Sequence, residues 1–263
     1  MARAVAALDL IRPDWPAPAR ICAVATTRTG GVSAGRYAAL NLGAHVQDDP
    51  AAVTRNRELL QSALGIATPP VWLNQVHGTT VVTARTAGPP PQADAAITVE
   101  PGVVCAILTA DCLPVLFCNR AGTHVAAAHT GWRGLAAGIL EATVATLGAA
   151  GAPADSLLAW LGPAIGLRAY EVGPEVREAF LRADPGDAAA FVPNRPGHWL
   201  LDLYGAARAR LHRAGVTAVT GGTHCTLTEA DRFYSHRRDA QTGRQATLIW
   251  LLREQARSKG TGP

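Results

Sequence analysis

Three short segments of the sequence combine polar, chemically reactive side chains with strongly apolar flanks. They are Gln75-Val76-His77-Gly78, Ala110-Asp111-Cys112, and the longer run from Ala128 to Gly134, which contains His129 and Arg133. Each lies beside a stretch that is predicted to form a buried β-strand, and strand ends hold side chains rigidly next to a cavity. Together the three segments supply two imidazoles and one thiol.

Two imidazoles and a thiolate are suitable ligands for a borderline-soft metal ion such as Zn²⁺. Three protein ligands and an open fourth position are typical of catalytic zinc, which holds a water molecule and lowers its pKa toward neutrality. Here the candidate ligands are His77, Cys112 and His129. Their spacing matches no local zinc signature, so the residue types alone leave a shared metal site as one hypothesis among others.

The same atoms fit two further interpretations. Cys112 is a candidate nucleophile, with His129 as its base and Asp111 or a backbone group as the orienting partner, because a reactive thiolate needs a neighbouring imidazole. In the other interpretation the thiol is buried in the core and both histidines are simply hydrogen-bonded. Both chemical hypotheses place Cys112 beside His129, and they differ in whether His77 joins them.

Composition and charge exclude several classes of protein. The chain has 263 residues, of which 48% are hydrophobic and 17% charged, enough for a sizeable core and unlike a disordered protein. The net charge of +4 is spread along the chain, and all but one of the basic residues are arginine, which is a weak signal for nucleic acid. Eight histidines without a His-x-His pair argue against a four-copper oxidase.

Neither a signal peptide nor a membrane-spanning helix is predicted. The apolar stretch at residues 4–11 contains Asp9 and runs into Arg12-Pro13, unlike a signal peptide. The longest run without a charged residue, 59–84, is interrupted by prolines and amides and is therefore a poor spanning helix. The odd number of cysteines and the lack of a CxxC pair argue against a disulfide framework and predict a cytoplasmic location.

The elements that position these residues are predicted from hydrophobic periodicity and turn signals. Strands are predicted at 21–27, 103–108, 113–118, 123–128, 156–161, 216–220 and 246–252, with two short strands within 71–82. Helices are predicted at 50–64, 135–147, 174–181 and 202–214. The irregular mixture favours an α+β or irregular α/β class over a doubly wound sheet. We expect a single domain over 1–263, with a flexible tail at 254–263.

A series of motifs in a fixed order covers most of the chain. They lie at residues 26–33, 41–43, 45–46, 49–50, 56–57, 74–78, 93–95, 109–114, 128–134, 162–166, 170–173, 202–203, 225–226, 231–239 and 242–245. In these motifs the sequence closely resembles the polyphenol oxidase/YfiH-type family, which is also described as the laccase-domain or purine nucleoside phosphorylase-like family.

This resemblance implies a single layered α/β domain, α+β-like, with mixed sheets flanked by helices in a fold shared with a toxin-type cysteine deamidase. It implies zinc held by His77, Cys112 and His129, with copper as the alternative metal. The implied enzyme cleaves adenosine, inosine, guanosine and methylthioadenosine with phosphate to the free base and a ribose 1-phosphate, and deaminates adenosine to inosine. The expected partners are a purine nucleoside and phosphate, and not nucleic acid or a membrane. The oligomeric state is left open.

Further side chains become candidate substrate ligands under this resemblance. Arginines beside loops are predicted to hold phosphate, because guanidinium forks match phosphate oxygens. They are Arg28, which precedes a glycine-rich loop that can offer backbone N–H groups, together with Arg133, Arg237 and Arg238. Asn41 and Gln75 are candidate ligands of purine or ribose, although buried amides also brace loops. His236 and Cys225 are predicted near the pocket, and His77, Cys112, His129 and Asp111 are the candidate catalytic groups.

Three other functions stay open at this point. The first is a cysteine hydrolase or amidase that uses Cys112 and His129 on a peptide or a cell-wall precursor. The second is a laccase-like polyphenol oxidoreductase with copper. The third is a non-catalytic protein that binds a nucleoside. The remaining cysteines are predicted to be small hydrophobic residues of the core; they are Cys22, Cys105 and Cys118.

Overall fold

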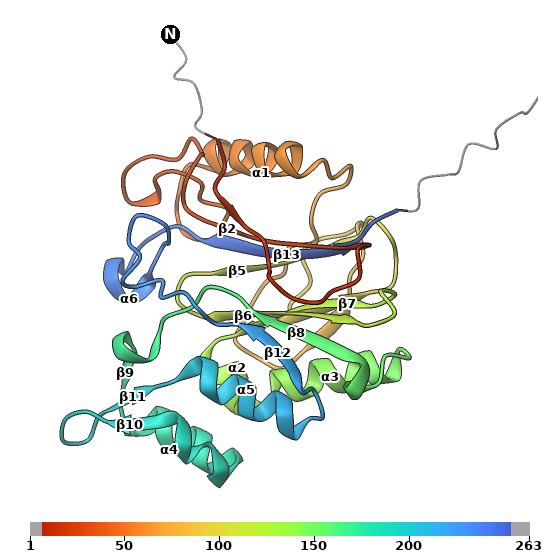
Figure 1. Cartoon of the computed structure of the whole chain (residues 1–263). Helices are drawn as coiled ribbons and strands as arrows, with labels where there is room; N and C mark the ends of the chain where they lie inside the picture. The colour runs from red at the N-terminus through yellow and green to blue at the C-terminus, as the bar shows by residue number, and fades with distance from the viewer. Residues whose placement is uncertain (1–6, 254–263) are drawn as a thin grey trace, which may run out of the picture.

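The computed structural model describes residues 7–253 of the chain. Residues 1–6 and 254–263 lie outside this part, and with them the predicted flexible tail. The described residues form stacked layers: one helix, a four-stranded sheet, a six-stranded sheet, and a group of helices on the far side (Figure 1). This arrangement of mixed sheets between helices confirms the predicted fold class.

The four-stranded sheet has the strand order β1-β2-β13-β5, and its pairs are antiparallel. Its strands are β1 (Leu10–Ile11), β2 (Ile21–Thr26), β5 (Val104–Thr109) and β13 (Gln245–Leu251). Because successive side chains of a strand point to opposite faces, Ile249 and Leu251 lie in the core between the two sheets. Leu248 and Trp250 lie in the cluster that contains Leu60 of helix α1 (Pro50–Leu64). Both faces of β13 are therefore buried.

The six-stranded sheet has the order β12-β8-β6-β7-β4-β3 and mixes parallel with antiparallel pairs. Its strands are β3 (Val81–Thr83), β4 (Ala95–Thr98), β6 (Leu113–Asn119), β7 (Val125–Thr130), β8 (Leu157–Leu161) and β12 (Ala218–Gly221). Leu116 and Cys118 of β6 point into the core between the sheets. Val115 and Phe117 point to the helical side, which is covered by α2 (Trp132–Ala137), α3 (Ile139–Ala149) and α5 (Leu203–Arg213).

A smaller sheet and a helix project from the helical side of the molecule (Figure 1). The sheet has the order β10-β11-β9, with β9 (Glu171–Val172), β10 (Phe191–Pro193) and β11 (Trp199–Leu201). The helix is α4 (Pro174–Ala183), which packs on α2 and so on the segment that follows His129. A single helical turn, α6 (His236–Asp239), lies near the carboxyl-terminal end of the described chain.

Helix boundaries follow the capping signals in the sequence. The Asp49 side chain accepts a hydrogen bond from the backbone N–H of Ala51 at the start of α1, Pro50 occupies the first turn, and Gly65 ends the helix in a left-handed conformation. Each of these residues is a preferred type at its position. The helix predicted at 50–64 is therefore observed with the same bounds.

Three predicted elements differ from the structure. The single helix predicted at 135–147 is two helices, because Gly138 adopts a φ of 98° and separates α2 from α3. The strand predicted to end at Ala128 continues to Thr130, so His129 lies inside β7. Of the two strands predicted within 71–82, only β3 is a strand in the described chain; Val71 forms a single bridge to Cys105.

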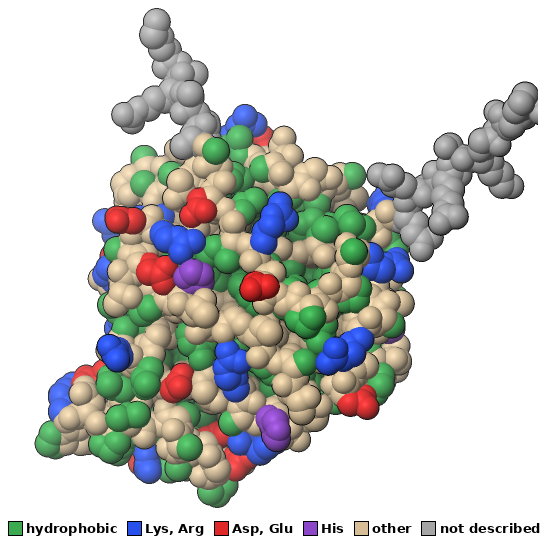
Figure 2. All heavy atoms as spheres, viewed as in Figure 1, with side chains coloured by type: hydrophobic (Ala, Val, Ile, Leu, Met, Phe, Trp, Pro, Cys, Tyr) green, Lys and Arg blue, Asp and Glu red, His purple; other side chains and the backbone are tan. Residues whose placement is uncertain are grey.

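The surface shows no single dominant character on the face seen in Figure 2. Basic and acidic side chains are interspersed there among apolar and neutral ones. Within residues 7–253, no helix is long and apolar enough to cross a bilayer.

Candidate active site and metal centre

His77, Cys112 and His129 are brought together from three separate segments. Cys112 lies in the loop that leads from β5 of one sheet to β6 of the other, His129 lies in β7, and His77 precedes β3. One potential ligand atom from each residue lies within 4.8 Å of the others. His77 Nε2 is 3.8 Å from Cys112 Sγ, and the two imidazole rings meet edge to face with centroids 4.7 Å apart. The three residues form a candidate metal centre.

The fully buried carboxylate of Asp94 holds both histidines in place. It accepts a hydrogen bond from His129 Nδ1 at 2.8 Å, from the backbone N–H of His77 at 2.9 Å and from that of Gly78 at 2.6 Å. Burial acts to raise the pKa of Asp94, but these hydrogen bonds outweigh it and the pKa is lowered. Because an ionised carboxylate only accepts hydrogen bonds, Nδ1 of His129 carries the proton and Nε2 is left to bind a metal.

The backbone at Gly131 passes so close to His77 and Cys112 that there is no room for a side chain. A Cβ atom at this position would lie 2.7 Å from His77 Cδ2 and 3.1 Å from Cys112 Sγ. The first of these distances is shorter than any van der Waals contact between carbon atoms, so only glycine fits without displacing the His77 ring. Helix α2 begins at the next residue, Trp132, and the chain therefore turns away from the metal centre at this glycine.

Asp111 supports the segment that carries Cys112. Its backbone has a φ of 86°, a conformation that residues other than glycine rarely adopt. Its carboxylate accepts hydrogen bonds from Thr226 Oγ1 at 2.6 Å, Ser235 Oγ at 3.0 Å and the backbone N–H of Arg237 at 2.6 Å. Asp111 therefore connects the Cys112 loop to residues 226–237, while Asp94 orients His129. The catalytic role predicted for Asp111 stays a prediction.

The thiol of Cys112 and the imidazole of His129 shift each other's pKa. Burial alone would raise the pKa of Cys112, but the charge on His129 and hydrogen bonds from His129 and His77 outweigh it and lower the pKa to about 6. Burial would lower the pKa of His129, but the Cys112 thiolate and the hydrogen bond to Asp94 raise it. Both shifts favour a thiolate at neutral pH, which is the form that binds metal.

A cavity of about 400 Å³ opens beside the metal centre. Three guanidinium groups line it, those of Arg133, Arg237 and Arg244. Its other lining side chains include two further imidazoles, two aromatic rings and three aliphatic side chains, namely His45, His236, Trp132, Tyr170, Leu108, Ile165 and Leu203. A cavity of this size with a few polar groups among apolar ones is typical of small-molecule sites.

Four of the six predicted substrate residues line this cavity: Gln75, Arg133, His236 and Arg237. The amide of Gln75 is already used, because its Nε2 donates to the carbonyl oxygen of Leu108 and its Oε1 accepts from the N–H of Leu108. Gln75 thus extends the edge of β5 and braces the loop that precedes His77.

Arg28 and Asn41 do not line the catalytic cavity. Asn41 is fully buried, and its amide bonds to Gly43, to Asp48 and to the backbone N–H of Arg244, so it braces a loop. Arg28 lines a different cavity. The glycine-rich loop after Arg28 suggested an anion site but gave no information about which cavity it faces.

Arg238 and Cys225, which were also predicted near the pocket, do not line the catalytic cavity. Arg238 hydrogen-bonds to backbone carbonyls of Thr226, Leu227 and Phe233 and pairs with Asp239, so it holds the loop together. Cys225 Sγ accepts a hydrogen bond from the backbone N–H of Gly166 at 3.3 Å, and it is not among the residues that line the catalytic cavity.

Sequence reasoning assigned no role to four residues that complete the site: His45, Asp94, Tyr170 and Arg244. Asp94 could have been predicted as a buried, functional residue, because it is a single carboxylate between Ala93 and Ala95 in an apolar stretch. A charge in such a place requires a hydrogen-bonding partner. The other three lie in loops that are far apart in the sequence, and only the tertiary structure brings them to the cavity.

Comparison with known proteins identifies the family. The sequence model of a family described as multi-copper polyphenol oxidoreductase laccase matches residues 22–252. This range includes all three candidate metal ligands. The chain belongs to this family. The resemblance stated from the motifs is therefore confirmed for the laccase/polyphenol oxidase family, which includes the YfiH-type proteins.

Relatives within the laccase family have both assigned names and solved structures. The chain is 57% identical to purine nucleoside phosphorylase PA4543 of Pseudomonas aeruginosa, over 92% of this chain and 98% of that protein. It is 53% identical to purine nucleoside phosphorylase YfiH of Escherichia coli, over 92% and 99%. The crystal structure of Neisseria meningitidis protein NMB0706 matches with a TM-score of 0.88 and 52% identity, over 93% and 99% of the two chains.

Proposed function

We propose that this protein is a metal-dependent purine nucleoside phosphorylase. The observation that carries the proposal is that one cavity of about 400 Å³ contains a His-Cys-His ligand set and the guanidinium groups of Arg133, Arg237 and Arg244. Relatives that are 57% and 53% identical are named purine nucleoside phosphorylase, which supports an enzyme role in nucleoside processing. The free cysteines of the structure fit a reducing cytoplasm, the location that we propose.

The ligand set fits a single zinc ion. Ligand atoms at about 2.3 Å (sulfur) and 2.1 Å (nitrogen) from one tetrahedral ion are about 3.6 Å apart, and His77 Nε2 lies 3.8 Å from Cys112 Sγ. The thiolate and two imidazoles are also ligands that zinc prefers. Within the described chain this is the one such group found, which does not supply the several copper ions of a laccase. When bound, zinc supplies a Lewis acid beside the substrate.

Arg133 and Arg237 are the groups that we assign to phosphate. The Arg133 guanidinium lies 4.4 Å from the Trp132 ring centroid, and it has no hydrogen bond to another described residue. Arg237 lies 5.1 Å from the Tyr170 ring and donates one hydrogen bond, from Nη1 to the carbonyl oxygen of Glu171. Each guanidinium thus lies over an aromatic ring, and its remaining N–H groups are free to bind phosphate oxygens.

In phosphorolysis, a phosphate oxygen forms a bond to the anomeric carbon of ribose while the bond to the purine nitrogen breaks. The purine leaves with the electron pair and takes up a proton. His45 is suited to contact the purine as a neutral imidazole, because burial and then the charges of Arg244, Arg57 and His129 lower its pKa. The arginines hold the anionic nucleophile next to the ribose, and this positioning supplies much of the rate enhancement.

The same residues could also carry out two other reactions, and the experiment described below distinguishes them from phosphorolysis. Deamination of adenosine to inosine would use the same metal centre. A cysteine hydrolase is favoured by one specific observation, the lowered pKa of the Cys112 thiol beside His129, since such a pair also activates a nucleophile.

The deciding experiment follows adenosine by chromatography with zinc-loaded protein. Adenine and ribose 1-phosphate that form only when phosphate is present support the phosphorylase, and inosine that forms without phosphate indicates deamination. A turnover-dependent covalent adduct on Cys112 of metal-free protein would indicate the hydrolase instead. If wild type forms neither product, and His77→Ala binds as much zinc as wild type, both the activity and the metal centre are refuted.

A further inference from the structure

A second cavity shares the helical turn α6 (His236–Asp239) with the catalytic cavity. It is shallower and more open to solvent than the catalytic cavity, and it is lined by Arg28, Arg36, Asp239 and Gln241. None of these four residues lines the catalytic cavity. The second cavity also accounts for Arg28, the arginine that the sequence predicted as an anion ligand and that the catalytic site does not use.

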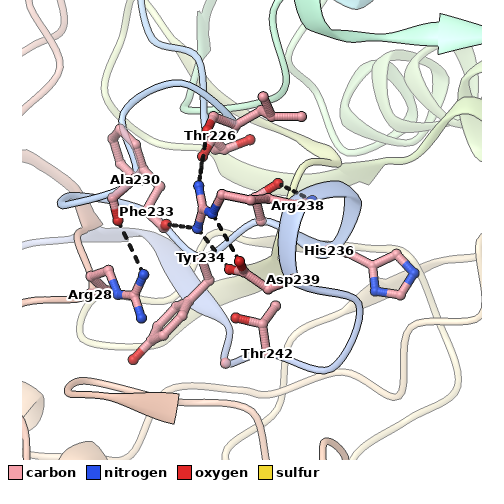
Figure 3. Close-up of polar contacts among 12 residues, drawn as sticks. Arg28, Thr226, Ala230, Phe233, Tyr234, His236, Arg238, Asp239 and Thr242 are labelled. Atoms are coloured by element: carbon pink, nitrogen blue, oxygen red, sulfur yellow. Dashed lines mark hydrogen bonds and ion pairs between the residues drawn. The ribbon is translucent and has the colours of Figure 1, made fainter. Parts of the chain in front are cut away.

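Arg28 is held rigidly at the wall of this cavity. Its guanidinium lies 4.7 Å from the centroid of the buried Tyr234 ring. Its Nη1 donates to the carbonyl oxygen of Ala230 at 3.1 Å (Figure 3). Its Nε donates to that of Ala38 at 2.9 Å. Within residues 7–253, Nη2 of Arg28 has no hydrogen-bond partner. The side chain is therefore fixed before any ligand binds, which lowers the entropic cost of binding.

The positive charges of the second cavity are not balanced by the protein. Among the described residues, neither Arg28 nor Arg36 forms an ion pair; Arg36 Nη1 donates only to the neutral Gln241 side chain. The one carboxylate of the cavity, Asp239, is already paired with Arg238 through two hydrogen bonds of 3.0 and 2.8 Å. The cavity thus presents two guanidinium groups whose charge no acidic side chain neutralises.

We propose that this second cavity is an anion-binding site for a small molecule that carries a phosphate group, separate from the catalytic cavity. A phosphate group suits this site because its several oxygens can accept hydrogen bonds from both guanidinium groups at once, from Nη2 of Arg28 and from the N–H groups of Arg36 that Gln241 does not use. This proposal does not depend on the phosphorylase reaction, since it concerns residues outside the catalytic cavity.

The short helix α6 connects the second cavity with the catalytic one. Its first residues, His236 and Arg237, line the catalytic cavity, and its last residue, Asp239, lines the second. In Figure 3, His236 points away from Arg28, and Tyr234, Arg238 and Asp239 lie between them. A ligand that binds beside Asp239 therefore contacts the same helical turn that holds two side chains of the catalytic cavity. Because Asp239 and Gln241 line the second cavity, a bound ligand should restrict the motion of this turn and of the residues that follow it.

The test counts phosphate sites on the zinc-loaded protein by equilibrium dialysis with labelled inorganic phosphate. Wild type is expected to bind two phosphates per chain, one in each cavity. Arg36→Gln should weaken the second site about tenfold or more, as expected for loss of a charge-assisted hydrogen bond. Arg28→Lys should weaken it in the same way while keeping the charge, because lysine lacks the planar fork. Arg55→Gln, an exposed arginine on α1, is the matched control and should bind as wild type.

The variants separate this proposal from the proposed function. If Arg133→Gln abolishes all phosphate binding, or if Arg36→Gln and Arg28→Lys both bind like wild type, the second site does not exist. If wild type binds one phosphate that is lost in Arg36→Gln and kept in Arg133→Gln, the second site stands and the phosphate assignment in the catalytic cavity fails. Hydrogen exchange supplies a second readout: phosphate should slow the exchange of backbone amides 237–241 in Arg133→Gln but not in Arg36→Gln.

Discussion

A single carboxylate, that of Asp94, fixes the geometry of both histidines at the metal centre. It hydrogen-bonds to the ring of His129 and to the backbone N–H of His77. These contacts leave Nε2 of His129 as the nitrogen that would bind a metal, and they place the turn that carries His77. Such partners of metal ligands tune metal affinity almost as strongly as the ligands themselves.

Asp94→Asn should weaken zinc binding about 10- to 100-fold. An amide oxygen can still accept one of these hydrogen bonds, but the new NH₂ group faces backbone N–H donors and has nothing to bind. Competition with a chromophoric chelator measures the affinity. Asp155→Asn, at an exposed carboxylate, should retain wild-type affinity. Equal affinities for Asp94→Asn and wild type would show that Asp94 does not position the ligands.

The reactivity of Cys112 in metal-free protein should report its lowered pKa. Alkylation requires the thiolate, so the rate should be high above about pH 6 and fall as the pH drops through that value, instead of near the ordinary 9.0. Cys105 and Cys118 should stay unlabelled, because burial raises both of their pKa values to about 12. His129→Gln removes the main charge that lowers the pKa and should move the inflection upward. Mass spectrometry of labelled peptides measures the alkylation rate of each cysteine as a function of pH. If the pH dependence of Cys112 alkylation is the same in His129→Gln as in wild type, the charge on His129 is not what lowers the pKa of Cys112.

At the scale of elements, the site depends on how loops join the two sheets. The loop from β5 to β6 carries Cys112 across from one sheet to the other, and Asp111 ties that loop to residues 226–237. The turn between β7 and α2 completes the metal centre, and it requires Gly131 at its closest approach to His77.

Gly131→Ala should abolish zinc binding while the protein stays folded. The added methyl group would lie 2.7 Å from the His77 ring, and the exposed His77 loop can move more easily than the buried β7. Gly148→Ala is the matched control, because it adds the same group in helix α3 where no atom lies within 4 Å; it should raise stability by about 0.5–1 kcal/mol. Metal analysis and thermal unfolding measure both variants. Full zinc occupancy in Gly131→Ala would refute the steric argument.

An element could be predicted from the sequence where the residues that determine its bounds lie next to it in the chain. Helix α1 was predicted with its observed bounds because Asp49, Pro50 and Gly65 are all local signals. The helix at 135–147 was predicted as one because Gly138 lies in an alanine-rich run that keeps helical periodicity, whereas in the structure Gly138 adopts a left-handed conformation. The residue types were enough to propose His77, Cys112 and His129 as one ligand set, and the structure brings them together. The loop motif after Arg28 did not specify which cavity this side chain lines.

On the scale of the whole molecule, the candidate metal centre lies where the layers meet. The three ligands come from β7 of one sheet, from the loop that crosses between the sheets, and from the segment before β3. A bound ion therefore links parts of the chain that no disulfide joins among the described cysteines. Metal binding should stabilise the entire fold, because it requires the assembled structure.

Zinc at about 100 times its dissociation constant should stabilise the native state by about 2.7 kcal/mol. For a chain of this size, this corresponds to an increase in Tm of roughly 5–11 °C. Thermal unfolding at increasing free zinc measures the shift, and a chelator should reverse it. His77→Ala should unfold at a temperature independent of zinc. A zinc-dependent shift of the same size in His77→Ala would mean that zinc acts elsewhere on the protein.

The position of β13 has a consequence for synthesis of the chain. This strand, Gln245–Leu251, lies between β2 and β5 in the four-stranded sheet, so one of the last strands to leave the ribosome completes a sheet whose other members were made much earlier. Until then β2 and β5 each present an unpaired edge, which invites aggregation. A message that stops before codon 245 would therefore yield an insoluble product, even though it encodes all three candidate metal ligands and every residue that lines the catalytic cavity.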